Sequence, residues 1–315
     1  MQLLHVQVDQ YLREQISHGK QGFSLATTPY NQMVDHMVNC HWHHEFEFGL
    51  LLSGGLDFRV NQIHFQLQKG DCMFITSNAL HMAKQSPHSA DTELLVAHLS
   101  PTLFSPNADG PVYRKYIAPL LGPSVQGFPI HRDSSAGRDI ATVLWELHQM
   151  NPDDFGYELN CIGLLSRLLR STLLYVDEGR RDVLVQSGSR DLENTAKDIL
   201  TFIHTHYAED ILVADLARHV HLSRSECFKC FRQYTNKTPI EYINEYRLAQ
   251  AAKQLTNTTR SVAEISMACG IGSSSYFGKL FKEKHGISPT EYRNRASRNA
   301  ETGEDSPRYF PNADK

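Results

Sequence analysis

The chain has 315 residues, of which 41% are hydrophobic and 21% are charged, and its formal net charge is −4. This length and composition predict two compact domains, each with its own hydrophobic core. No apolar run reaches about eighteen residues, and the opening MQLLHVQVDQ lacks a basic stretch followed by an apolar one, so we expect neither a membrane span nor a signal peptide.

Six cysteines are present, and only Cys227 and Cys230 form a C-x-x-C pair. No second pair of ligands lies nearby, so we expect these two residues to pack in a core rather than to bind zinc or carry out redox chemistry. Scattered single cysteines are typical of the reducing cytoplasm.

Short segments of alternating polar and apolar residues fill the region from 23 to about 100. Turn residues separate them, such as Gly54 with Gly55 and Asn61 with Gln62. Several short strands at this spacing predict a small barrel or jelly roll. The expected strands are 46–52, 56–60, 63–67, 73–76 and 94–99.

One group of residues in this region has the composition of a chemical site. His41 and His43 are two residues apart, so on a strand both point to the same face, and Glu47 and His81 follow. This pattern resembles the two cupin motifs.

In cupins the four matching positions bind a divalent metal, and three imidazoles with one carboxylate suit Zn, Fe, Mn or Ni equally. The match is incomplete, because Thr76 and Asn78 replace the usual proline and glycine. The alternative interpretation is that the same polar side chains line a pocket that holds no metal.

The region that follows is helical. A short helix is expected at 112–121, and apolar residues recur at helical spacing from Ile140 to Leu147 and again from Leu165 to Leu173. These two striped helices could cover the barrel, or they could form a dimer contact. A polar linker at 179–192 follows, and the tail at 299–315 is expected to be disordered.

The last third of the chain contains a repeat at a spacing of fifty residues. FRQYTNKTPIEYI, which begins at Phe231, is answered by FKEKHGISPTEYR, which begins at Phe281. Such a repeat indicates two copies of one supersecondary unit.

Each copy has the pattern of a helix-turn-helix. Ser223 and Ser273 are suitable N-caps for the second helix of each copy, and a capping box joins Ser261 to Glu264. Residues 240–255 predict a connecting helix of about 24 Å, which is long enough to act as a rigid spacer.

The charge of this repeat predicts a nucleic-acid partner. Residues 218–298 contain 14 Lys or Arg and 6 Asp or Glu, which gives +8 and leaves −12 for the rest of the chain. A basic surface of this kind neutralises phosphates, and two helices on a spacer could enter successive major grooves about 34 Å apart. A plain helical bundle with a solvated basic face is the alternative.

Two sets of exposed side chains are expected on these helices. The residues expected to contact base edges are Arg224, Ser225, Phe228, Lys229, Ser274, Ser275 and Lys279. The residues expected to contact phosphates are Arg232, Lys282 and Lys284.

From Arg247 onward, RLAQAAKQLTNTTRSVAEISMACGIGSSSYFGKLFKEKHGISPTEYR resembles the signature of AraC/XylS-type transcription regulators over about one hundred residues. Ile271 stands where an aromatic residue is usual, and Asn236 replaces the glycine that the second copy keeps as Gly286. Asparagine tolerates the left-handed conformation, so the second difference has little structural consequence.

The resemblance implies an α+β protein with a cupin-like N-terminal barrel, a helical dimerisation pair, and two helix-turn-helix units joined by a linker helix. The expected domains are 1–178 for effector sensing and dimerisation and 193–298 for DNA binding. In this family the helix pair often forms an antiparallel dimer contact, which would here use Ile140, Leu144, Leu165 and Leu169.

The sequence is therefore interpreted as a cytoplasmic regulator or activator of transcription, not an enzyme, that binds double-stranded DNA as a homodimer and needs no cofactor. A small-molecule effector, with a carbohydrate as one candidate, would contact His41, Trp42, His43, Glu47 and His81. RNA polymerase is a further candidate partner. The alternatives are a metal-dependent cupin enzyme fused to a DNA-binding module, and a constitutive DNA-binding protein whose barrel only dimerises.

Overall fold

The computed structural model shows two compact units, and the main division falls between Arg190 and Asp191. Most of the expected linker at 179–192 and all of the expected tail at 299–315 lie outside the described residues. None of the described helices combines the length and the apolar character that a membrane span needs. The structure describes residues 6–9, 11–16, 22–33, 36–89, 91–105, 107, 110–122, 125–177, 190–235 and 237–294.

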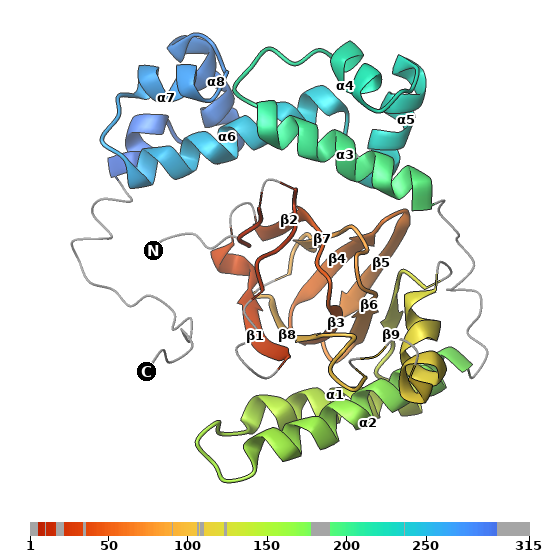
Figure 1. The fold of residues 1–315 in the computed structure, drawn as a ribbon. Helices are drawn as coiled ribbons and strands as arrows, with labels where there is room; N and C mark the ends of the chain where they lie inside the picture. Colours follow the sequence, from red (N-terminus) through yellow and green to blue (C-terminus); the bar gives the residue numbers. More distant parts are fainter. Residues whose placement is uncertain are drawn as a thin grey trace. The chain divides into compact units, whose positions relative to one another are not determined.

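Two antiparallel β-sheets form most of the N-terminal unit (Figure 1). The five-stranded sheet has the spatial order β1 (Phe23–Pro29), β8 (Glu93–Leu99), β3 (Phe46–Ser53), β6 (Cys72–Ile75) and β9 (Gly127–Ile130). The four-stranded sheet has the order β2 (Met37–His41), β7 (His81–Gln85), β4 (Gly55–Val60) and β5 (Ile63–Gln68).

The five strands predicted from alternation are confirmed as β3, β4, β5, β6 and β8. The turn at Asn61 and Gln62 joins β4 to β5 and pairs Val60 with Ile63, as the hairpin pattern predicts. Asn61 has a φ of 50°, a left-handed conformation that asparagine adopts more readily than most residues.

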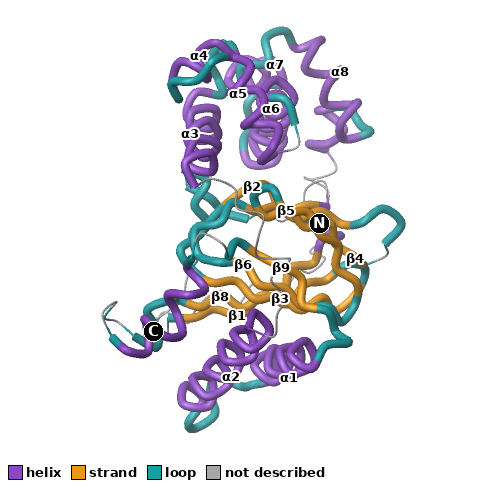
Figure 2. The backbone as a smooth tube through the Cα atoms, turned by 90° about the vertical axis from the view of Figure 1, so that its right-hand side faces the viewer, coloured by secondary structure: helices purple, strands orange, loops and turns teal. Residues whose placement is uncertain are grey.

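A hydrophobic core lies between the two sheets. Leu56 and Phe58 of β4 contribute to it from the four-stranded sheet, and Leu94 and Val96 of β8 contribute from the five-stranded sheet. Figure 2 shows the two sheets as facing layers. No described strand belongs to both sheets, so the closed barrel is not seen; the architecture is a mixed helix and sheet fold with two sheet layers.

The other face of the five-stranded sheet is covered by α1 (Ser135–Gln149) and α2 (Tyr157–Asp177), which lie side by side along it (Figure 1). Both helices were predicted from their apolar spacing, and both are confirmed. Phe48 and Phe74 of the sheet pack in the same core as the apolar stripes of the helices.

This packing corrects one expectation about assembly. The four residues predicted as the dimer contact are each exposed by 6% or less, and they lie in the core against the sheet, so the prediction that they form the interface is wrong. Burying them on this sheet is what makes α1 and α2 part of the same folded unit. The residues concerned are Ile140, Leu144, Leu165 and Leu169.

A short helical segment was also predicted at 112–121. The chain forms a π-helical turn at Tyr113–Ile117 and then a 3-10 turn at Ala118–Leu121. Pro119 follows the first turn and lacks a backbone N–H, so a regular α-helix would lose one of its hydrogen bonds there.

The C-terminal unit is helical throughout its described residues. Figure 1 shows α6 running between two short helix pairs, with α3 beside it. The helices are α3 (Arg190–His206), α4 (Val213–His219), α5 (Arg224–Thr235), α6 (Pro239–Asn257), α7 (Val262–Ala268) and α8 (Ser274–His285).

The spacer predicted at 240–255 is confirmed as α6, which has 19 residues and a length of about 28 Å at 1.5 Å per residue. A capping box between Thr238 and Glu241 fixes its start, and Pro239 occupies the first helical turn. One end of α6 contacts α5 and the other contacts α7, so this helix links the two repeated units.

Candidate DNA-binding surface and buried histidine cluster

The two helix-turn-helix units are α4 with α5 and α7 with α8. The predicted caps are present: the Ser223 hydroxyl accepts a hydrogen bond from the backbone N–H of Glu226, and the Ser273 hydroxyl accepts one from Tyr276. The capping box between Ser261 and Glu264 closes the start of α7. These local bonds set where each helix begins.

Buried aromatic residues orient both second helices. Phe231 on α5 and Phe277 and Phe281 on α8 are fully buried, as the repeat predicted. The opposite helical face is therefore directed to solvent. Cys227 and Cys230 are also buried on α5, which confirms that this pair packs in the core.

Most of the residues predicted to contact DNA lie on these solvent-facing surfaces. Phe228 is the exception on α5, because it is only half-exposed. The predicted residues that are exposed are Arg224, Ser225, Lys229, Arg232, Ser274, Ser275, Lys279 and Lys282.

Lys284 has a different environment from the other predicted phosphate contacts. It is half-buried, and its Nζ lies 3.8 Å from Oε1 of Glu245 on α6. Lys237 pairs with the other oxygen of the same carboxylate. This ion pair holds Lys284 toward the spacer helix.

Tyr276 is an exposed residue that the sequence analysis did not select. It is half-exposed at the third position of α8, where the fifty-residue repeat aligns it with Glu226 of α5. The repeat register gave no signal for it, because Glu226 was not among the predicted DNA contacts.

The N-terminal unit brings together four of the five predicted effector residues. His41 ends β2, His43 follows it, and His81 begins β7 of the same sheet, while Glu47 projects from β3 of the facing sheet. One ligand atom from each of these residues can be chosen so that all four lie within 4.8 Å of one another. We call these four residues the histidine cluster.

Two contacts in the histidine cluster run to one carboxylate oxygen. Oε2 of Glu47 lies 2.9 Å from Nε2 of His43 and 3.1 Å from Nε2 of His81. The four side chains are each exposed by 7% or less. The ring centroids of His41 and His81 are only 4.1 Å apart, so the imidazoles pack directly against one another.

The opposite nitrogen of each imidazole is held by the main chain. Nδ1 of His41 lies 2.8 Å from the carbonyl oxygen of Asn39, and Nδ1 of His81 lies 2.8 Å from that of Ala79. Nδ1 of His43 lies 3.2 Å from the carbonyl oxygen of Glu45. Because a carbonyl oxygen only accepts hydrogen bonds, each Nδ1 carries the proton.

Burial and mutual charge shift the pKa values of the histidine cluster. Burial alone would raise the pKa of the Glu47 carboxyl, but the charges of His81 and His43 and their contacts hold it well below its usual range. Burial, together with the charge of His41, lowers the pKa of His81 to about 4. Burial opposes the charging of His41, but its bond to Glu14 outweighs this and raises the pKa.

Two neighbours of the histidine cluster were not predicted. Oε2 of Glu14 lies 3.3 Å from Nε2 of His41, and Nε2 of His98 lies 3.8 Å from Oε2 of Glu47. A single histidine in the apolar run at 94–99 was a signal for His98. No local pattern marks Glu14.

Trp42 is not part of the histidine cluster. It stands between His41 and His43 in the chain, and its ring packs edge-on against His44. Alternation along an extended chain places it on the opposite side from the two cluster histidines.

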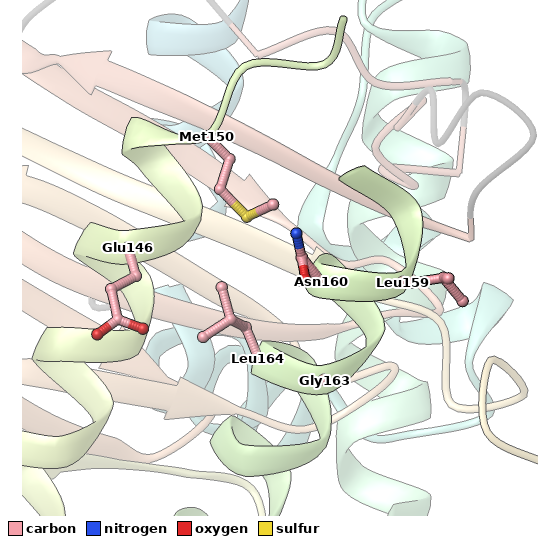
Figure 3. A pocket seen from close by; sticks show the side chains of 6 residues that line it. All are labelled: Glu146, Met150, Leu159, Asn160, Gly163 and Leu164. Carbon is pink, nitrogen blue, oxygen red and sulfur yellow. The ribbon is translucent and has the colours of Figure 1, made fainter. Parts of the chain in front are cut away.

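A separate hollow of about 450 Å³ lies between α1 and α2. In Figure 3 Met150, at the end of α1, points toward Asn160 of α2. The five-stranded sheet separates this hollow from the histidine cluster, because the helices pack on the face opposite to the one from which Glu47 projects. Its lining residues are Glu146, Met150, Leu159, Asn160, Gly163 and Leu164.

Sequence comparisons agree with the geometry of the C-terminal unit. A family model described as "Helix-turn-helix domain" matches residues 216–295, which span both repeated units. The chain is 27% identical over 292 residues to the uncharacterized HTH-type transcriptional regulator YdeC of Bacillus subtilis (strain 168), covering 91% of this chain and 97% of that protein. The C-terminal unit therefore carries a helix-turn-helix domain, and the chain is similar to HTH-type transcriptional regulators.

Other similarities are weaker or more local. The HTH-type transcriptional activator RhaS of Enterobacter sp. (strain 638) is 24% identical over 80% of this chain and 86% of its own length. A crystal structure of a transcriptional regulator described by its AraC-type DNA-binding domain, from Chromobacterium violaceum, is 27% identical, has a TM-score of 0.32, and covers 33% of this chain and 94% of that one. With these similarities and the two helix-turn-helix units, the chain is a DNA-binding transcription regulator.

Proposed function

We propose that this chain is an AraC-family regulator that senses a ligand in its N-terminal unit, at the histidine cluster, and changes transcription in response. The single observation that carries the proposal is the convergence of four ionisable side chains from two sheets into one buried group. Buried charged groups destabilise a fold unless they are paired, and a DNA-binding protein does not need such a group in a separate unit.

The N-terminal unit is proposed to be a cupin-like sensor domain. Two antiparallel sheets that face each other, with the cluster residues at the spacing of the cupin motifs, support this assignment. We assign the cluster a binding role rather than a catalytic one, because its tightly packed side chains leave little surface for a substrate to approach.

We also propose a homodimer through the outer surface of α1 and α2. This surface carries Trp145, Leu159 and Ile162, which are all exposed by more than 40%, next to the hollow described above. Large apolar side chains exposed on neighbouring helices are typical of a protein interface.

The remaining partners follow from the regulatory role. The protein is proposed to bind double-stranded DNA through α5 and α8 in the cytoplasm, where the chromosome is accessible. RNA polymerase is the expected partner if the protein acts as an activator, as the name of the relative RhaS suggests.

A reporter experiment tests the sensing role. A DNA site selected from a random library with the full-length protein is placed upstream of a reporter gene, and expression is measured with a panel of sugars and divalent metal salts. We expect one compound to change the output of the wild type, and His81→Gln to give an output that does not change. His64→Gln is the matched control, because His64 is exposed on β5.

The wild type, His81→Gln and His64→Gln must first be shown to bind the selected site in vitro. This control separates a loss of sensing from a loss of DNA binding. If His81→Gln responds to the compound as the wild type does, the sensing site lies outside the histidine cluster. If no compound in a broad panel changes the wild-type output, the protein acts constitutively.

A further inference from the structure

The histidine cluster has an unusual arrangement of hydrogen-bonding groups. All three imidazoles have their Nδ1 protons committed to main-chain carbonyl oxygens, at 2.8 Å for His41, 3.2 Å for His43 and 2.8 Å for His81. In a neutral imidazole the other nitrogen, Nε2, is then an acceptor. The main chain therefore fixes three nitrogen lone pairs in orientation.

Two of these lone pairs, on His43 and His81, face a group that is itself an acceptor. The carboxylate of Glu47 presents Oε2 to Nε2 of His43 at 2.9 Å and to Nε2 of His81 at 3.1 Å. Two acceptors at such distances repel each other unless a cation or a proton lies between them. The arrangement needs positive charge at its centre.

Nε2 of His81 is the clearest sign of this need. It is buried, and it has no hydrogen-bonding partner among the described residues although Glu47 is close. A buried polar atom without a partner is rare in native proteins and calls for a missing group. This atom points into the histidine cluster.

The spacing of the four ligand atoms suits one small ion. Metal–nitrogen and metal–oxygen bonds of about 2.0–2.2 Å place ligands on opposite sides of an ion about 4.4 Å apart, and adjacent ligands about 3.0–3.4 Å apart. The cluster atoms lie within 4.8 Å of one another. An inward shift of a few tenths of an ångström would complete the coordination, whereas a sugar would require the packed rings to separate.

We propose that His41, His43, Glu47 and His81 bind one divalent first-row transition-metal ion, which is the ligand that the regulator senses. Three imidazole nitrogens and one carboxylate oxygen favour ions such as Zn²⁺, Fe²⁺, Co²⁺ or Ni²⁺. Mg²⁺ and Ca²⁺ are excluded as the preferred ions because they take oxygen ligands. Main-chain carbonyls that hold the distal nitrogens are the support that metal-binding histidines usually have. This inference rests on the proposed function for its regulatory meaning.

The test is direct metal binding by the full-length protein. The chain is treated with a chelator, dialysed, and titrated with Co²⁺ alone, and its visible absorption and metal content are recorded. We expect one tightly bound Co²⁺ per chain. His81→Gln should lose more than about 100-fold in Co²⁺ affinity, since removal of a ligand exceeds the loss seen for outer-shell partners.

His64→Gln is again the control, because the chain has 17 histidines and exposed ones bind Co²⁺ weakly. It should keep the tight site. A wild-type chain without a tight site, or His81→Gln with unchanged affinity, overturns the proposal.

A second measurement needs only the wild type, in case His81→Gln does not fold. Bound Co²⁺ shifts the NMR signals of nearby protons, and three Nδ1 protons protected by main-chain carbonyls should give three strongly shifted exchangeable signals. Any other number contradicts coordination by the three Nε2 atoms.

The two proposals fail in different ways. Tight Co²⁺ binding with an unchanged reporter response of His81→Gln keeps the metal site and rejects its role in sensing. A reporter response that His81→Gln abolishes, in a protein that binds no Co²⁺, keeps the sensor and rejects the metal.

Discussion

Asn78 shows how one residue places part of the histidine cluster. Its φ of 65° is left-handed, and its backbone N–H donates to the carbonyl oxygen of His43 at 2.7 Å. The resembling motif has glycine at this position, and asparagine is among the few residues that adopt the same conformation without large strain. The substitution noted in the sequence therefore preserves the turn beside His43.

Lys229 is the residue on α5 for which base recognition can be tested most simply. It is exposed on the face opposite to the buried Phe231. Lys229→Ala should weaken binding to the selected site by about 1–3 kcal/mol and relax the preference at one base pair. Fluorescence anisotropy with the selected site and its single-base variants measures both effects.

Lys84→Ala is the matched control, because Lys84 is exposed on β7 of the N-terminal unit. Equal weakening of Lys229→Ala on every DNA sequence would assign Lys229 to a phosphate contact instead. Unchanged affinity would remove it from the interface.

At the scale of elements, α2 has two apolar faces with different roles. One face packs against the five-stranded sheet, and Leu169 on it is exposed by only 6%. The other carries Leu159, which is exposed by 76%. Substitutions of these two leucines can therefore distinguish the contribution of α2 to folding from its contribution to assembly.

Leu159→Glu should change assembly, whereas Leu169→Glu should change the stability of the N-terminal unit. Leu159→Glu is expected to give folded monomers, because it places charge at the proposed interface without disturbing the core. Leu169→Glu is expected to destabilise the N-terminal unit by about 3–5 kcal/mol, because the charge would be buried without a partner. Sedimentation velocity and thermal unfolding measure the two outcomes.

A wild-type protein that stays monomeric at micromolar concentration would remove the basis for the dimer. A Leu159→Glu variant that still dimerises would place the interface on another surface.

At the scale of the whole molecule, sensing and DNA binding belong to different units. The histidine cluster lies in the unit that ends at Arg190, and α5 and α8 lie in the one that begins at Asp191. Most of the linker expected at 179–192 lies outside the described residues. If the histidine cluster regulates DNA binding, ligand binding at the cluster must change the affinity of α5 and α8 for DNA. That change is a coupling free energy between the two sites.

Operator affinity should depend on the metal in the full-length protein. We expect saturation with Zn²⁺ to change the affinity for the selected site by about 1–3 kcal/mol relative to chelator-treated protein, the usual range for coupled sites. By linkage, the selected DNA must change the affinity for Zn²⁺ by the same factor. Anisotropy with and without Zn²⁺, and Zn²⁺ titration with and without DNA, give the two numbers.

His81→Gln supplies the control for this coupling, since it should show one operator affinity at every Zn²⁺ concentration. Equal operator affinities of the metal-loaded and chelator-treated wild type would show that bound metal does not regulate DNA binding.

Much of the DNA-binding unit could be predicted from the sequence by itself, because short-range interactions define it. The caps at Ser223, Ser261 and Ser273 act within three residues, and the buried aromatics recur at i, i+4. The fifty-residue repeat then indicates two such units. Alternation likewise identified β3 to β6, and the short motif identified His41, His43 and Glu47.

Only the tertiary structure decided what depends on pairing between distant segments. Strands β1, β2, β7 and β9 were not among the strands predicted from alternation, and each of them pairs with a strand that is distant in the sequence. The same long-range packing brings Glu14 beside His41 and His98 beside Glu47, and it turns Ile140 and Leu165 toward the sheet instead of toward a partner. An apolar stripe shows that a helix face is buried, but the fold determines which surface buries it.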